Sequence, residues 1–147
     1  MQKITTFLTL DHAEEAAKLY VSLFEGSRIV KTMPGPDGQV LTVELELAGQ
    51  TYVFMQQTSF PKLNESTSLS VSCENQAEVD RYWAALTANG GKEVQCGWLV
   101  DRFGVSWQIV PRVMLEIITG PDRARAGRAM QAMMKMVKLD VATLENA

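Results

Sequence analysis

Two stretches of this 147-residue chain carry the same order of secondary-structure signals, 63 residues apart. In each stretch a strand-like run is followed by an amphipathic helical pattern and then by three more strand-like runs. A shift of 63 residues superposes matching positions in both strand and helix: Leu8 on Val71, Glu15 on Glu78, Ala16 on Val79, Leu19 on Tyr82, Tyr20 on Trp83 and Leu23 on Leu86. The repeat predicts two copies of one β-α-β-β-β module.

The expected fold class is α+β, with two such modules forming facing curved mixed sheets around a cleft, plus C-terminal helices. One domain of 147 residues is expected, with module one over residues 3–57, module two over 66–110 and a helical tail over 112–147. Asp11 and Asn75 are expected to cap the two module helices, since each has a glutamate three residues later. The expected strands are residues 4–10, 28–33, 41–47, 50–57, 68–73, 92–96, 98–101 and 105–110.

The tail after Pro111 carries an amphipathic pattern in which Pro121 marks a helix start. Its apolar face consists of Ala126, Met130, Met133, Met134 and Val137, and its basic face of Arg123, Arg125, Arg128, Lys135 and Lys138. A basic amphipathic helix can bind a membrane or a calmodulin-like partner. Docking on its own sheet or across a homodimer is the simpler interpretation. A homodimer with the tail at its interface is therefore expected.

Composition excludes several function classes. A formal net charge of −3 argues against nucleic acid as a partner, which requires a surplus of lysine and arginine. No apolar run approaches the roughly 20 residues that cross a bilayer, and the N-terminal residues do not resemble a signal peptide. Cys73 and Cys96 form no CxxC pair, so neither a zinc site nor a disulfide framework is indicated. We expect a cytoplasmic protein.

The block QCGWLVDRFGVSWQIVP, from Gln95 to Pro111, contains the most unusual polar position in the chain. Gln108 lies among large apolar residues near the end of the last expected strand. An amide in such a place must be hydrogen-bonded, face water or contact a ligand. Trp98 and Trp107 either line a ligand site beside it or belong to the core.

Several segments resemble the vicinal oxygen chelate superfamily of glyoxalase I, bleomycin-resistance proteins and extradiol dioxygenases. More closely, the chain resembles the PhnB-like proteins labelled 3-demethylubiquinone-9 3-methyltransferase. The segments that carry the resemblance are FLTLDHAEEAAKLYVSLFEGSRI, PGPDG with LTVELELAGQ, SCENQAEVDRYW, the Gln95 to Pro111 block, and the tail sequence MQAMMKMVKLDVATL. His12 departs from this pattern, because the family usually has a small residue there.

Enzymes of this superfamily place four metal ligands on facing strands, two in each module. The resemblance transfers these positions to Thr5 and Glu44 in module one and to Ser68 and Gln108 in module two. Divalent metals favour imidazole, thiolate or carboxylate ligands, so two hydroxyls, one amide and one carboxylate form a poor site. We therefore expect no metal and no cofactor. The four side chains remain candidates for ligand binding, with Glu44 and Gln108 approaching each other across the cleft.

Glu44 is the one candidate catalytic residue. If it is buried without a counter-ion, a raised pKa would suit a proton donor or a general base. The alternative is that Glu44, like Glu46, lies on the exposed face of an amphipathic strand. His12 is the only histidine and lies at a helix start, which favours a solvated surface role over catalysis.

These residues favour a small-molecule binding protein of the glyoxalase and bleomycin-resistance type without a catalytic metal. The alternative is a metal-dependent lyase, isomerase or dioxygenase with a degenerate site. A dimeric structural protein without a ligand stays open as a third interpretation. Methyltransferase activity is not expected, because the chain has no glycine-rich loop between a strand and a helix, and Gly90 and Gly91 end a helix instead.

Overall fold

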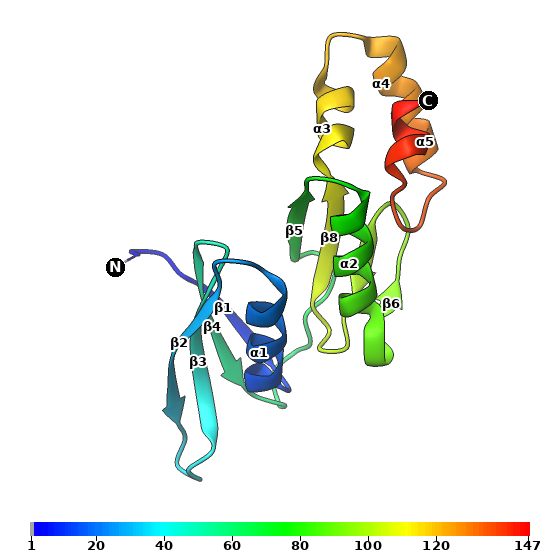
Figure 1. Ribbon diagram of the computed structural model, residues 1–147. Coiled ribbons are helices and arrows are strands. Elements are labelled where there is room, and N and C mark those ends of the chain that lie inside the picture. Colours follow the sequence, from blue (N-terminus) through cyan, green and yellow to red (C-terminus); the bar gives the residue numbers. More distant parts are fainter. Residues whose placement is uncertain (1) are drawn as a thin grey trace. The chain divides into compact units, whose positions relative to one another are not determined.

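The computed structural model describes residues 2–147 and divides into two compact units, one that ends at Leu63 and one that begins at Asn64. Each unit contains one β-α-β-β-β module (Figure 1). The two sheets have the same strand order, β1-β4-β3-β2 and β5-β8-β7-β6. The predicted α+β class and the internal repeat are thus confirmed.

Module one contains β1 (Thr6–Leu10), α1 (Ala13–Leu23), β2 (Arg28–Pro34), β3 (Val40–Leu47) and β4 (Gln50–Gln56). β1 and β4 pair in parallel, and the other strand pairs are antiparallel. α1 packs on β3 and β4, and the alternation of β3 decides which side chains it covers. Val43, Leu45 and Leu47 are buried toward the helix, whereas Glu44 and Glu46 lie on the other face of the sheet.

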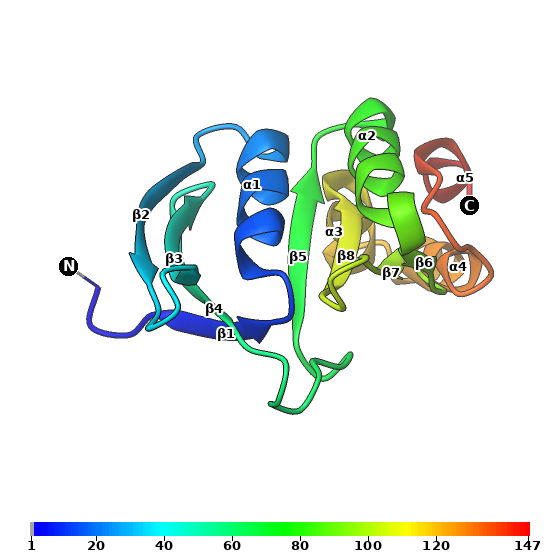
Figure 2. The same ribbon diagram turned by 90° about the horizontal axis from the view of Figure 1, so that it is seen from below.

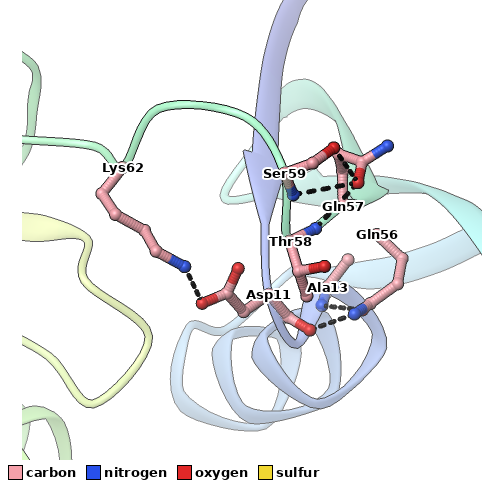
Figure 3. Close-up of polar contacts among 7 residues, drawn as sticks. All are labelled: Asp11, Ala13, Gln56, Gln57, Thr58, Ser59 and Lys62. Carbon is pink, nitrogen blue, oxygen red and sulfur yellow. Dashed lines mark hydrogen bonds and ion pairs between the residues drawn. The ribbon is translucent and has the colours of Figure 1, made fainter.

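The start of α1 differs from the predicted capping box. His12 occupies the N-cap position without a side-chain cap, and Gln56 at the end of β4 supplies the missing bonds (Figure 3). Its amide oxygen accepts a hydrogen bond from the backbone N–H of Ala13 at 2.9 Å, and its amide nitrogen donates to the carbonyl of Asp11. The Asp11 carboxylate instead pairs with Lys62. A partner 43 residues away thus does what the local sequence assigned to Asp11.

Module two contains β5 (Ser68–Cys73), α2 (Gln76–Thr87), the short 3-10 helix η1 (Ala88–Gly90), β6 (Lys92–Glu93), β7 (Trp98–Val100) and β8 (Ser106–Pro111) (Figure 2). The predicted cap of α2 is confirmed, because the Asn75 side chain accepts from the backbone N–H of Glu78 at 3.0 Å. β6 is shorter than predicted. The chain leaves the strand because Cys96 and Gly97 have φ of 62° and 82°, which extended backbone does not allow.

The turn from β7 to β8 is organised by Asp101, which is only 3% exposed. One carboxylate oxygen accepts from the backbone N–H groups of Phe103 at 2.9 Å and Val105 at 3.0 Å. The other accepts from the indole N–H of Trp107 at 2.9 Å. A buried charge needs such donors, and here they fix the register of the hairpin that carries Gln108.

The tail adds α3 (Arg112–Thr119), α4 (Arg123–Met133) and α5 (Val141–Glu145) to the second unit. These helices pack on one another, and their apolar core joins Val110 of β8 to Met114, Leu139 and Leu144. Docking of the tail on its own module is thus confirmed. The predicted apolar face is divided, however, since Ala126 is buried while Met130, Met134 and Val137 are 43%, 62% and 38% exposed. None of the helices between residues 2 and 147 has the length and apolarity to span a bilayer.

Candidate functional site

The candidate site in module two lies on the sheet face opposite α2. Successive side chains of β8 alternate between the two faces, so Trp107 and Ile109 pack toward α2 while Gln108 projects the other way. The strand register places Ser70 of β5 and Trp98 of β7 directly beside Gln108. The row Ser70–Gln108–Trp98 therefore crosses three neighbouring strands on one face, with Ser68 one pair further along β5.

The Gln108 side chain is half-buried and held in place from one side. Its amide nitrogen donates a hydrogen bond to the hydroxyl of Ser68 at 2.9 Å. Within residues 2–147, its carbonyl oxygen has no hydrogen-bond partner. This hydrogen bond joins two of the four candidate residues, and the amide keeps one acceptor on the face opposite α2.

The two tryptophans of the motif have different places. Trp98 is half-buried and lies next to Gln108 on the same face. Trp107 is 2% exposed, lies on the α2 side and donates its indole N–H to Asp101. Trp107 is thus a core residue, which corrects its assignment as a ligand-site residue. Adjacent residues of a strand face opposite ways, so Trp107 and Gln108 could not share one site wall.

The structure also corrects the equivalence of Glu44 and Gln108. Glu44 lies on β3, whereas Gln108 lies on β8, whose counterpart in the matching strand order is β4. Phe7 is the module-one equivalent of Ser70, and it pairs with Val53 as Ser70 pairs with Gln108. Val53 is therefore the structural counterpart of Gln108. The resemblance placed Glu44 and Gln108 on equivalent strands, but the two modules have loops and strands of different length.

Glu44 has a counter-ion, contrary to the condition set for its candidate role in catalysis. The Nζ atom of Lys31 on β2 lies 3.6 Å from its carboxylate, and the Glu44 side chain is 32% exposed. Arg28 donates two 3.0 Å hydrogen bonds to the Glu46 carboxylate, and this contact raises the pKa of the Arg28 guanidinium. Both glutamates thus belong to a row of cross-strand ion pairs, as the amphipathic-strand alternative predicted. Thr5 immediately precedes β1 and is half-buried.

The donor set does not fit a divalent metal. The module-two row offers two hydroxyls and an amide, and the Glu44 carboxylate in module one is paired with a lysine. Across residues 2–147 no group of three histidine, cysteine or acidic side chains is placed to hold a metal ion. His12 is exposed and lines an open hollow of about 690 Å³ with Glu14, Glu15 and Asp37.

Comparison with protein-family models shows a match to 3-demethylubiquinone-9 3-methyltransferase over residues 2–110. The chain belongs to this family. A putative 3-demethylubiquinone-9 3-methyltransferase, the PhnB protein from Bacillus cereus, is 32% identical, with a TM-score of 0.68 over 75% of this chain and 99% of that one. The search of curated proteins gives no match.

Two more distant structures share the fold. The fosfomycin resistance protein FosX from Listeria monocytogenes is 12% identical, with a TM-score of 0.52 over 75% of this chain and 91% of that one. A glyoxalase/bleomycin resistance protein from Albidiferax ferrireducens T118 is 16% identical, with a TM-score of 0.50 over 76% and 99%. These two likenesses show a shared fold. The family match ends at residue 110, so it does not support the expected resemblance of the tail.

Two features of the site went unrecognised in the sequence. Ser70 was not singled out, although the alternation Ser68-Leu69-Ser70 on a strand would have placed it beside Gln108. The pairing of Trp98 with Gln108 depends on the β7–β8 register, which the Asp101 turn sets. That turn is visible in the sequence as Asp101-Arg102-Phe103-Gly104, but its buried carboxylate is not.

Proposed function

We propose that the protein binds a small molecule on the face of module two opposite α2, without a catalytic metal. The observation that supports this most directly is the half-buried Gln108 amide, fixed by Ser68 on one side and free to accept a hydrogen bond on the other. Polar groups that converge beside an aromatic wall are typical of small-molecule sites. Ser70 and Trp98 supply that setting.

The chemistry of the row indicates the ligand class. Ser68, Ser70, Trp98 and Gln108 carry no formal charge, so they offer little to a phosphate, a carboxylate or an ammonium group. An indole favours a flat apolar surface, and the amide and hydroxyls favour neutral donors and acceptors. The ligand is therefore an uncharged molecule with a planar apolar part and at least one hydrogen-bond donor directed at the Gln108 carbonyl oxygen.

The test is a binding screen of neutral aromatic amides and phenols against protein treated with a metal chelator. Binding should quench the fluorescence of Trp98, and Gln108→Leu should weaken the affinity about 10-fold or more, because one partner of a buried hydrogen bond is lost. Gln95→Leu is a matched control, since Gln95 is exposed in the preceding loop. Equal affinity of the Gln108→Leu and Gln95→Leu variants would overturn the assignment of the site.

A second experiment separates this proposal from the metal-dependent alternative. Gln108→Glu replaces a neutral amide by a carboxylate beside two serine hydroxyls, so its affinity for Mn²⁺ should rise measurably above that of the wild type. The free Mn²⁺ concentration is measured by electron paramagnetic resonance. Stoichiometric, tight Mn²⁺ binding by the unmodified protein would instead favour a metal-dependent lyase, isomerase or dioxygenase.

The family name refers to a methyltransferase, and this fold does not support a Rossmann-type one. Such enzymes bind their cofactor on a largely parallel sheet, at a glycine-rich loop that opens a helix. Each sheet here has one parallel strand pair, and Gly90 and Gly91 follow the end of α2. The binding proposal therefore rests on the residues of module two and not on the name.

A further inference from the structure

We propose that the C-terminal segment of residues 136–141 is a strap that positions Trp98 and thereby controls ligand binding in module two. This inference rests on the proposed function for its ligand, but its structural part stands independently. The strap lies beyond residue 110, where the family match ends. It follows α4, ends at Val141, the first residue of α5, and packs against the loop that leads into β7.

The strap satisfies two backbone donors of that loop. The N–H groups of Cys96 and Gly97 donate to the carbonyls of Met136 and Val137, each at 2.8 Å. Both loop residues have positive φ, which is costly for a cysteine. Without the strap, the loop would keep an unfavourable backbone conformation and lose the bonds that compensate for it. The strap therefore stabilises the loop conformation in which Trp98 follows Gly97.

Close packing fixes the strap in its place. A Cβ atom on residue 97 would lie 2.8 Å from Cδ1 of Leu139 and 3.1 Å from the carbonyl oxygen of Ile109, so only glycine allows this approach. Leu139 is fully buried in the cluster with Met114 and Leu144. The leucine side chain thus occupies the space that the glycine leaves.

The strap is also anchored to α2 by polar contacts. Gln76, the first residue of α2, donates to the carbonyl of Leu139 at 3.1 Å and accepts from the backbone N–H of Val141 at 2.7 Å. Lys138 pairs with Asp80 one turn further along the helix at 2.7 Å. These contacts hold both ends of the Leu139 backbone against module two.

Two structural connections link the strap to the candidate site. Gly97 is bonded covalently to Trp98, and its carbonyl accepts from the N–H of Ile109, the neighbour of Gln108, at 2.8 Å. Val110, the next residue on the Gln108 face of β8, belongs to the same apolar cluster as Leu139. The strap and the ligand both favour one position of Trp98. The docked strap should therefore increase the affinity for the ligand, and bound ligand should stabilise the docked strap.

The first test uses protein without ligand, labelled with 5-fluorotryptophan, in which Trp98→Phe assigns the Trp98 resonance. Leu139→Ala should shift that resonance and raise the amide exchange rates of Cys96 and Gly97 by about 10-fold or more, while the core resonances of Trp83 and Trp107 stay unchanged. Leu115→Ala is the matched control, because Leu115 is 47% exposed in the same tail. An unchanged Trp98 resonance with unchanged exchange would overturn the strap.

Two further variants keep the test decisive if Leu139→Ala does not fold. Gln76→Leu removes the anchoring bonds without opening the apolar cluster, and it should produce the same pair of changes in weaker form. Gly97→Ala should displace the strap by steric conflict, and Leu139→Ala in the same chain should relieve part of that displacement, since it removes the clashing atoms. Strictly additive effects of the two substitutions would contradict the packing argument.

The final arm measures the affinity of the Gln76→Leu variant for a neutral aromatic amide that binds the wild type. The affinity should be lower than that of the wild type by about 5-fold or more, when both are measured at a concentration of denaturant at which the chain stays folded. A changed Trp98 resonance with unchanged affinity would refute the regulatory part of the inference. If no neutral compound binds the wild type, the proposed function fails while the ligand-free tests of the strap still stand.

Discussion

Replacement of Asp101 by alanine should destabilise module two strongly, because its carboxylate satisfies donors that water does not reach. The backbone N–H of Val105 and the indole N–H of Trp107 both donate to it, and these residues are 3% and 2% exposed. Each buried donor left without a partner costs roughly 1–3 kcal/mol. The two together predict a loss of about 2–6 kcal/mol in the free energy of unfolding. The third donor, Phe103, is half-buried and adds less.

The assay is urea unfolding followed by tryptophan fluorescence. All three tryptophans of the chain, Trp83, Trp98 and Trp107, lie in module two, so the signal reports on this module. At a typical slope of about 1–3 kcal/mol per molar urea, the midpoint should fall by roughly 1 M or more. Asp101→Asn keeps one carbonyl oxygen as an acceptor and should fall between the wild type and the alanine variant.

Asp37→Ala is the matched control, and its unfolding is followed by far-ultraviolet circular dichroism because Asp37 lies in module one, which has no tryptophan. Asp37 also accepts from a backbone N–H in a β-hairpin turn, that of Gln39 at 3.0 Å, but it is exposed. Water replaces the lost acceptor there, so the cost should stay below about 1 kcal/mol. If Asp101→Ala proved no more destabilising than Asp37→Ala, the assignment of a buried structural role to Asp101 would be refuted.

Three other outcomes are expected. Burial raises the pKa of the Cys73 thiol to about 12, and the Cys73 side chain is fully buried. Iodoacetamide at pH 8 should therefore alkylate the half-buried Cys96 first, and mass spectrometry that showed Cys73 modified first would contradict this. Hydrogen bonds from Lys138 and Gln76 lower the pKa of Asp80, and bonds from Thr143 lower that of Asp140. Both carboxylates therefore stabilise the tail above the ordinary aspartate pKa of about 3.9, and this stabilisation is lost as pH falls through their lower pKa values in the folded protein. After correction for intrinsic rates, amides of α5 should exchange faster near pH 3 than at pH 5. Light scattering should give twice the mass of one chain. Met134→Glu should lower the measured mass toward that of the monomer, because Met134 is a 62% exposed apolar residue of the tail. A wild-type monomer at micromolar concentration would refute the dimer.

Local patterns in the sequence were sufficient to predict most of the fold. The repeat, the strand alternation around Val43 and Leu45 and the cap at Asn75 all depend on residues close in sequence, and the structure shows each of them. The cap of α1 was mispredicted because Gln56 reaches it from β4. β6 was predicted too long because the positive φ of Cys96 depends on bonds to a tail 40 residues later.

The arrangement of the candidate residues differs in part from the expectation, because tertiary pairing decides which of them meet. Ser68 and Gln108, two of the four candidates, are joined by a hydrogen bond, and Trp98 lies beside Gln108. Glu44 was equated with Gln108 through the family resemblance, whereas the structure sets the equivalence between the modules by strand register. The strap could not be inferred, because Leu139 and Gly97 are brought together only by tertiary packing.

The most direct test of the binding proposal follows the Gln108 side-chain amide and the Trp98 indole by two-dimensional NMR in chelator-treated protein. Addition of neutral aromatic amides and phenols should shift both resonances together for at least one compound, while the indole of Trp107 in the core stays in place. The shifts should disappear at Trp98 in the Gln108→Leu variant and persist in Gln95→Leu. If no compound moved the two resonances, or if they moved only after a divalent metal was added, a metal-free site at Gln108 would be contradicted.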